Sequence, residues 1–337
     1  MTSQPPAESE GASVVSRTRP VAVGAPVVAA HFLGRTAFFV LAEEAVVLVP
    51  PQGDEQRVAV DGGILSSVCD GSRIVIAGDN GRVLAIDAAG QSSVIGADAK
   101  RRWIDRVALG PDGAVAWSAG KSVTVKTAKG EERGLDVPSS VGGLAFAPKG
   151  FRLAIAHYNG VTLWFPNTAA PPEFLEWKGS HLGVTFSPDG KFLVTTMQEP
   201  MLHGWRLADR KNMRMAGYST KVLSLDWSAD GRWLASSGAE QLILWPYQSK
   251  DGPMGQAPRM LAPYQTRACA VACHPAQEVV AAGFEDGLAL LVRVNDGAEI
   301  IARRPSGAPV SALAWEPAGS RLAIGTEDGD AGLVDLS

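Results

Sequence analysis

The sequence has few cysteines and no long apolar run. Its 337 residues contain three cysteines, Cys69, Cys269 and Cys273. Three thiols, two of them four residues apart, cannot form the disulfide framework of a small secreted domain, so we expect a reducing compartment, the cytoplasm. The longest apolar runs, such as residues 45–51, are far shorter than the roughly 18 to 20 residues that a membrane helix needs. We therefore expect no membrane span.

The sequence also lacks a large excess of charge of either sign. Lys and Arg number 31 against 35 Asp and Glu, which gives a net charge of −4, and basic clusters such as residues 100–102 are short. Nucleic-acid binding normally needs an extended basic surface, so a nucleic-acid partner is not expected. Residues 1–13 lack the basic and apolar parts of a secretory signal. We predict a disordered tail over residues 1–18.

The sequence does contain one repeated motif: an alternating apolar segment that ends in a large residue, a glycine turn, and a second alternating apolar segment. The clearest copies turn at Gly150, Gly190, Gly231 and Gly319. Weaker copies turn at Gly34, Gly71, Gly113 and Gln277, the last without its glycine. The turns are 37 to 46 residues apart. A strand-rich repeat of about 40 residues is typical of a β-propeller.

Each repeat contains four segments with strand-type alternation, here called a, b, c and d. In the first repeat they are residues 27–32, 36–42, 45–50 and 57–60. The eighth repeat ends without a segment d, whereas residues 19–24 resemble the segment d at 57–62. We therefore predict an all-β propeller over residues 19–337, with about eight four-stranded antiparallel blades closed by an N-terminal strand. Seven blades are the alternative, if one repeat is degenerate.

The repeats resemble those of the WD-repeat β-propeller family over about residues 19–337. The resemblance is carried by the turn Phe186-Ser187-Pro188-Asp189-Gly190 and by Trp164, Trp205 and Trp245 at the ends of segments c. It implies a rigid, non-catalytic scaffold that binds other proteins through its loops. No repeat has the family's Gly-His or Trp-Asp pair. We therefore expect apolar packing to replace much of the family's Asp-His-Ser-Trp hydrogen-bond network.

The residues give little support for an enzyme. Segments a, which line the channel of a propeller, are small and apolar, and the titratable residues in them are His31 and Asp226. We expect both to form hydrogen bonds within the wall. The sequence contains no nucleophile elbow, no His-Glu-x-x-His pattern and no phosphate-binding loop.

Cys269, Cys273 and His274 could form a metal site or have a structural role. The two cysteines lie on one face of a strand but about 13 Å apart along it. One Zn²⁺ ion with bonds of about 2.3 Å cannot join them. We interpret them as buried thiols of the core, and expect neither a metal nor another cofactor.

Aromatic and basic residues gather in the loops. In a WD-type blade the d–a and b–c connections lie on one face of the disc. We predict that this face binds a protein or peptide, because Trp, Tyr and Arg are enriched in binding hot spots. The predicted partner-binding residues are Trp103, Arg106, Tyr158, Trp177, His181, Tyr218, Tyr264, Arg267 and Phe284. The alternative is that each aromatic residue fills the gap between neighbouring blades, the role that we assign to Trp117, Trp164, Trp205, Trp227, Trp233, Trp245 and Trp315.

These observations favour a soluble protein-binding scaffold. Two other functions remain open: a module that holds a small ligand or a modified residue at the channel mouth, and an enzyme or metal-handling propeller.

Overall fold

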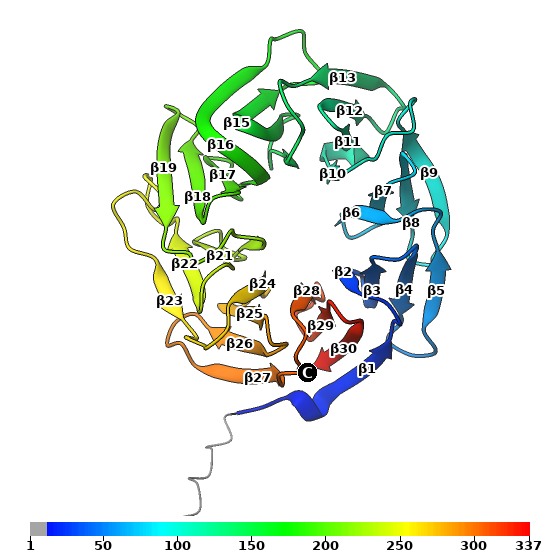
Figure 1. Cartoon of the computed structure of the whole chain (residues 1–337), viewed down its shortest axis with the longest axis vertical. Helices are drawn as coiled ribbons and strands as arrows, with labels where there is room; N and C mark the ends of the chain where they lie inside the picture. Colours follow the sequence, from blue (N-terminus) through cyan, green and yellow to red (C-terminus); the bar gives the residue numbers. More distant parts are fainter. Residues whose placement is uncertain (1–11) are drawn as a thin grey trace, which may run out of the picture.

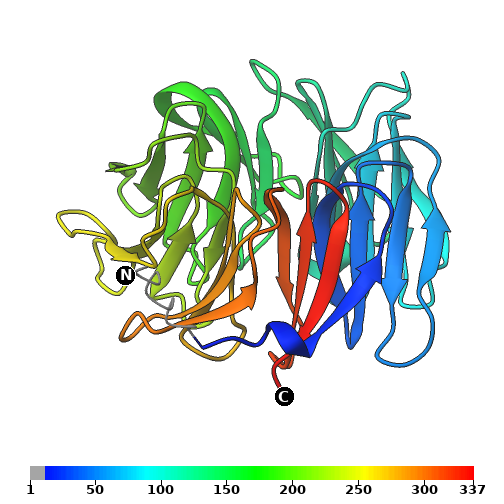
Figure 2. The same ribbon diagram turned by 60° about the horizontal axis from the view of Figure 1, so that its bottom comes forward.

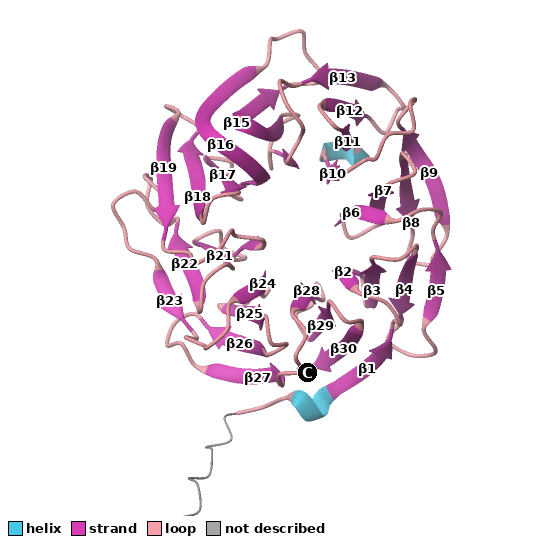
Figure 3. Cartoon of the chain, viewed as in Figure 1, coloured by secondary structure: helices cyan, strands magenta, loops and turns pink. Residues whose placement is uncertain are grey.

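The computed structural model describes residues 12–337. They form a closed ring of antiparallel sheets around a central channel (Figure 1). The described residues contain strands and two short 3₁₀ turns, η1 (Val15–Arg17) and η2 (Pro111–Gly113), but no α-helix (Figure 3). Consequently, no helix in residues 12–337 is long and apolar enough to cross a membrane.

The first three repeats each form one four-stranded sheet, as alternating apolar segments separated by tight turns predict. The first comprises β2 (Val27–Leu33), β3 (Thr36–Leu41), β4 (Ala45–Val49) and β5 (Gln56–Ala59). The second comprises β6 (Ile64–Cys69), β7 (Ile74–Gly78), β8 (Arg82–Ile86) and β9 (Ser92–Ala97). The third comprises β10 (Arg106–Leu109), β11 (Val115–Ala119), β12 (Ser122–Lys126) and β13 (Glu132–Asp136).

The fourth and fifth repeats share one six-stranded sheet. It comprises β14 (Gly143–Phe146), β15 (Leu153–Trp164), β16 (Glu173–Phe186), β17 (Phe192–Met197), β18 (Met201–Arg206) and β19 (Lys211–Ala216). The beginning of β15 pairs with β14 and its end pairs with β16. Asn159 and Gly160, which have positive φ values, lie between these two parts. Likewise, β16 pairs with β15 over residues 173–176 and with β17 over residues 183–186. Each of these long strands therefore contains two of the predicted segments.

The remaining repeats are again four-stranded. The sixth comprises β20 (Leu225–Trp227), β21 (Trp233–Ser236), β22 (Leu242–Pro246) and β23 (Arg259–Leu261). The seventh comprises β24 (Ala268–Cys273), β25 (Val279–Phe284), β26 (Ala289–Arg293) and β27 (Glu299–Arg303). The last comprises β28 (Val310–Trp315), β29 (Arg321–Thr326), β30 (Asp330–Asp335) and the N-terminal β1 (Thr18–Ala22).

The propeller fold is confirmed, and the number of blades depends on the unit counted. Counted as hydrogen-bonded sheets, the ring has seven members, the number given above as the alternative. The eight sequence repeats fit into these seven sheets because the six-stranded sheet contains two of them.

The predicted closure by the N-terminal strand is also confirmed. β1 pairs antiparallel with β30, from Thr18 opposite Val334 to Ala22 opposite Asp330. Figure 2 shows the two strands side by side near the C-terminus. Val21 and Val23 are buried against the first and last sheets. The first residues of the propeller therefore complete its last sheet.

Residues 12–17 are also placed against the ring. The amide of Val14 donates to the carbonyl of Ile301 at 2.9 Å, and the amide of Ile301 donates to the carbonyl of Ala12 at 2.8 Å. These bonds cover the outer edge of β27, so packing begins before the tail boundary predicted at residue 18. The rest of the predicted tail, residues 1–11, lies outside the described residues.

The core consists of apolar layers between neighbouring sheets. The tryptophans assigned a structural role lie in these layers: Trp117, Trp164, Trp205 and Trp245 are buried, while Trp227, Trp233 and Trp315 are partly buried and pack on apolar clusters. Close packing is visible at Gly96, where a Cβ atom would come within 2.8 Å of the Trp117 ring. The second and third repeats are therefore closely packed at this position.

Candidate functional site

The channel wall is built from the first strand of each repeat (Figure 1). His31 and Asp226 in this wall hydrogen-bond to neighbouring repeats, as expected. Nε2 of His31 lies 2.9 Å from Oγ of Ser67, and burial lowers the pKa of His31 to about 4. The carboxylate of Asp226 accepts the amides of Trp227 at 2.9 Å and Cys273 at 2.7 Å, and burial raises its pKa to about 6. Both side chains therefore link strands of the channel wall.

The cysteines and His274 are likewise engaged within the fold. All three cysteines are free thiols. Sγ of Cys269 donates to the carbonyl of Val310, and burial raises the pKa of Cys269 to about 12. Nδ1 of His274 accepts two turn amides, while Nε2 lies 3.1 Å from the carbonyl of Gly319. Within residues 12–337 no three His, Cys, Asp or Glu residues are grouped as metal ligands would be.

The antiparallel order of strands places the d–a and b–c connections on one face of the disc. We call this the aromatic face, because Trp103, Tyr158, Trp177 and Tyr264 lie in its connections. Trp103 is 64% exposed and Tyr158 is 54% exposed, while Trp177 and Tyr264 are half-buried. Arg106 and Arg267 are half-buried as well. Six of the nine predicted partner-binding residues thus reach the surface.

The other three, His181, Tyr218 and Phe284, lie in the interior, which corrects their prediction as surface residues. Phe284 is fully buried in the core between the sixth and seventh repeats. Tyr218 lies in the connection after β19 and His181 lies within β16, and both side chains turn inward to hydrogen-bond partners. These three side chains therefore fill space inside the fold, in agreement with the alternative interpretation given above.

Tyr218 and His181 also correct the expectation that apolar packing replaces the polar network. The Tyr218 hydroxyl lies 2.8 Å from Oγ of Ser236 and accepts Nε1 of Trp245 at 2.6 Å. Burial raises its pKa to about 12. In the fifth repeat, Nδ1 of His181 lies 2.8 Å from Oγ1 of Thr195. Two repeats therefore keep a buried polar network, one of them with tyrosine as its hub.

Tyr264 and Arg267 are held by the neighbouring b–c turn. The Tyr264 hydroxyl donates to Oδ2 of Asp286 at 2.8 Å, and its ring meets Phe284 edge to face at 5.0 Å. Arg267 pairs with Glu285 at 2.8 Å. These contacts fix the two side chains against the face, so they add less free contact surface than Trp103 and Tyr158.

Tyr158 and Trp177 border a cleft of about 420 Å³ between the fourth and fifth repeats. Its walls include Met197, with Lys178 and Glu199 among its charged residues. The Trp177 ring stacks on the buried ring of His203 at 3.9 Å, which fixes the indole from below. Neither ring nitrogen of His203 has a hydrogen-bond partner within the described residues, and burial lowers its pKa to about 3.

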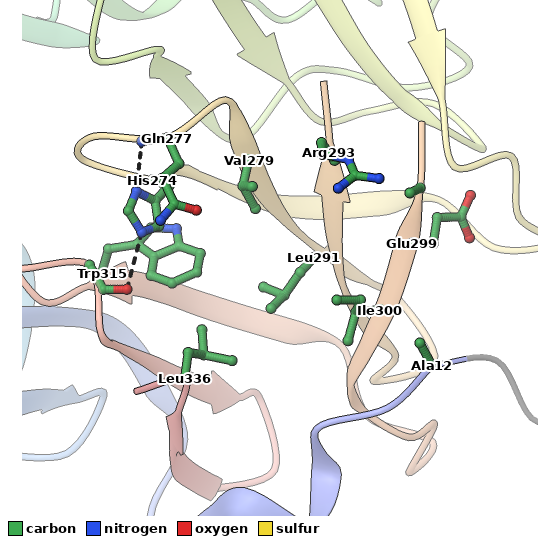
Figure 4. A pocket seen from close by; sticks show the side chains of 12 residues that line it. Ala12, His274, Gln277, Val279, Leu291, Arg293, Glu299, Ile300, Trp315 and Leu336 are labelled. Atoms are coloured by element: carbon green, nitrogen blue, oxygen red, sulfur yellow. Dashed lines mark hydrogen bonds between the residues drawn. The ribbon is translucent and has the colours of Figure 1, made fainter. Parts of the chain in front are cut away.

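A second hollow, of about 510 Å³, opens on the opposite face at the seam between the seventh and last repeats (Figure 4). Val279, Leu291, Ile300 and Leu336 form its apolar floor, and the Trp315 ring meets His274 at 4.7 Å. Sequence reasoning missed this hollow because its residues belong to four strands and both chain ends. Their spacing along the sequence gives no signal.

Comparisons with known proteins agree with this architecture. The family model "WD domain, G-beta repeat" matches residues 210–245, and the model "Anaphase-promoting complex subunit 4 WD40 domain" matches residues 271–337. The crystal structure of the computationally designed Ika8 protein has a TM-score of 0.76 and 16% identity, covering 92% of this chain and 96% of that one.

The structure of U3-55K has a TM-score of 0.59 and 15% identity, covering 81% of this chain and 95% of that one. At these identities, the likeness concerns the fold alone. No curated protein matches the sequence. The repeats, the closed ring and the two family matches, which cover residues 210–245 and 271–337, together support a WD-repeat β-propeller.

Proposed function

We propose that the chain is a non-catalytic scaffold that binds a protein or peptide partner through its aromatic face. The observation that carries this proposal is the exposure of Trp103 and Tyr158, each more than half exposed on connections between tightly packed sheets. Large aromatic rings on a rigid surface offer contact area with little loss of conformational entropy, which is why they dominate binding hot spots.

The cleft beside Tyr158 supports the same function. Its aromatic and thioether groups provide an apolar floor, and Lys178, Glu199 and Arg214 provide charges at its edge. An apolar centre with a polar rim is the usual anatomy of a protein-binding site. The cleft can accept one or two side chains of a bound peptide.

A non-catalytic role is supported by the use of the channel's titratable groups. His31 and Asp226 are occupied by hydrogen bonds that join repeats. The three free thiols support a reducing compartment, and we place the protein in the cytoplasm on this ground.

The proposal is tested by affinity capture of the tagged protein from its own cell extract, followed by mass spectrometry. A Trp103→Ala/Tyr158→Ala variant should lose a partner that the unchanged chain recovers. The control is Val94→Ala, because Val94 is 59% exposed on the outer strand β9, away from the aromatic face. Equal recovery by all three proteins would contradict the proposal. Tyr218 is left unchanged, because removing its buried hydroxyl would disturb folding.

A further inference from the structure

The first strands carry a repeated irregularity at the channel mouth on the aromatic face. Five of the channel-lining segments shift register near the channel mouth, which leaves one residue of each unpaired as a β-bulge: Val28, Leu65, Leu182, Cys269 and Ser311. A bulge turns a side chain away from the sheet. Val28 and Leu65 are accordingly exposed, and so is Leu223, the corresponding residue of the sixth repeat, at 67%.

One part of this mouth is hollow. A cavity of about 680 Å³ lies along the fifth repeat between Arg106 of the third repeat and Lys221 before the sixth. Leu182 and Leu223 belong to its apolar lining. The described residues that line it include these two cations and no carboxylate, although the whole chain has a net charge of −4.

Arg106 is oriented before any ligand arrives. Its Nε donates to the carbonyl of Gly142 at 2.5 Å and its Nη1 to the carbonyl of Asp105 at 2.6 Å. Nη2 makes no hydrogen bond to the described residues. Lys221 is exposed and has no ion-pair partner in residues 12–337. Both cations therefore have donors available for an anion.

Thr196 adds a hydroxyl group to the same wall. The residue is 8% exposed and lines the cavity, yet its hydroxyl has no hydrogen-bond partner among the described residues. Gly183 keeps the space next to it open, because a Cβ atom there would lie 2.9 Å from Oγ1 of Thr196. This hydroxyl is therefore available to hydrogen-bond a polar group that enters the cavity.

We propose that this basic channel-mouth pocket, formed by Arg106, Leu182, Thr196, Lys221 and Leu223, binds an acidic segment of a protein partner. A carboxylate of the segment lies between Arg106 and Lys221, and an adjoining aliphatic side chain packs on Leu182 and Leu223. The choice of an acidic and aliphatic segment follows from charge complementarity and from the two leucines. The inference rests on the proposed function, since it names the chemistry of the partner that the aromatic face receives.

The test measures fluorescence anisotropy of labelled peptides with the full chain at about 0.15 M salt, where charges further apart than about 8 Å are largely screened. The probe is Gly-Leu-Asp-Leu-Asp-Leu-Gly, and its matched control has Asn in place of each Asp. The protein variants are Lys221→Glu in the pocket and Lys121→Glu as the control. Lys121 is exposed in a b–c connection of the same face and does not line the pocket.

We expect the Asp peptide to bind at least about tenfold more tightly than the Asn peptide. Lys221→Glu should weaken it by about tenfold or more, and Lys121→Glu by less than about threefold. The proposal is overturned by equal binding of the two peptides, by no binding of the Asp peptide at about 1 mM protein, or by equal losses in both variants. A labelled oligo-dT that binds through Lys221 in preference to the Asp peptide would assign the pocket to phosphate and also overturn it.

Failure here is distinguishable from failure of the proposed function. If the Asp peptide does not bind, yet Trp103→Ala/Tyr158→Ala abolishes capture of a partner, then the scaffold function stands and the acidic-segment inference falls. If the peptide binds as expected but capture does not depend on Trp103 and Tyr158, then the pocket binds an acidic segment and the proposed role of these two aromatic residues is wrong.

Discussion

At the scale of single residues, the interior of the ring contains polar side chains that hold repeats together. The Tyr218 hydroxyl is bonded to both Ser236 and Trp245 within the sixth repeat. Its loss would leave the buried Nε1 of Trp245 without a partner, whereas Oγ of Ser236 would keep its hydrogen bond to the carbonyl of Ile243. A buried group costs about 1–3 kcal/mol when desolvated without a hydrogen bond.

We therefore predict that Tyr218→Phe lowers the free energy of unfolding by about 2 kcal/mol, although the ring and its packing remain. The measurement is urea unfolding followed by tryptophan fluorescence. Tyr158→Phe is the control, because Tyr158 is exposed and the Phe variant should unfold at the same urea concentration as the unchanged chain. A Tyr218→Phe variant with an unchanged midpoint would show that the hydroxyl network adds no stability.

The buried imidazole of His203 leads to a prediction of how the free energy of unfolding depends on pH. Burial lowers its pKa to about 3, against about 6.5 in an unfolded chain. A base with a lowered pKa stabilises the fold fully above pH 6.5, and this contribution is lost as the pH falls toward 3. When the pH falls from 7 to 4.5, the free energy of unfolding of the unchanged chain should therefore decrease by about 2 kcal/mol more than that of His203→Leu. Parallel stability curves for the two proteins over this range would refute the role of His203.

The predicted binding residues show what sequence can reveal at this scale. Trp103 and Tyr158 are predicted from their place in the d–a and b–c connections of one face, and the structure places both on the surface. His181 and Tyr218 occupy similar places in the sequence but are buried. The difference lies in their partners, Thr195 and Ser236, which come 14 and 18 residues later. Loop position alone does not determine which way a side chain turns.

At the scale of strands, the repeat pattern predicted most elements because alternation and turn glycines are local signals. It also predicted the pairing of β1 with β30, since β1 resembles the missing fourth strand. The joining of two repeats in one sheet was not predicted. It depends on how far β15 and β16 continue through the turns at Tyr158 and Gly179, which is a property of tertiary packing.

Closure by β1 leads to a prediction for truncated chains. Removing residues 1–24 exposes the edge of β30 and removes the buried side chains of Val21 and Val23, so the free energy of unfolding should fall by about 3 kcal/mol or more. Removing residues 1–11 keeps every contact described above and should leave stability unchanged. Both are measured by urea unfolding, and equal midpoints for the two truncated chains would contradict the closure.

At the scale of the whole molecule, a closed ring of tightly packed sheets presents two faces with different chemistry. The aromatic face carries exposed rings, a cleft and a basic channel mouth, whereas the opposite face carries the apolar hollow at the closing seam. A rigid ring binds without reordering, so affinity depends on a few fixed side chains. The central claim is therefore that one defined face receives the partner.

The most direct measurement of this claim is photo-crosslinking in the native extract. A photoreactive phenylalanine analogue is placed separately at Tyr158 on the aromatic face, at Val94 on the outer edge and at Gln277 on the opposite face. We predict that position 158 crosslinks one abundant protein, and that positions 94 and 277 do not. Crosslinking of the same protein from position 277 but not from position 158 would contradict the account.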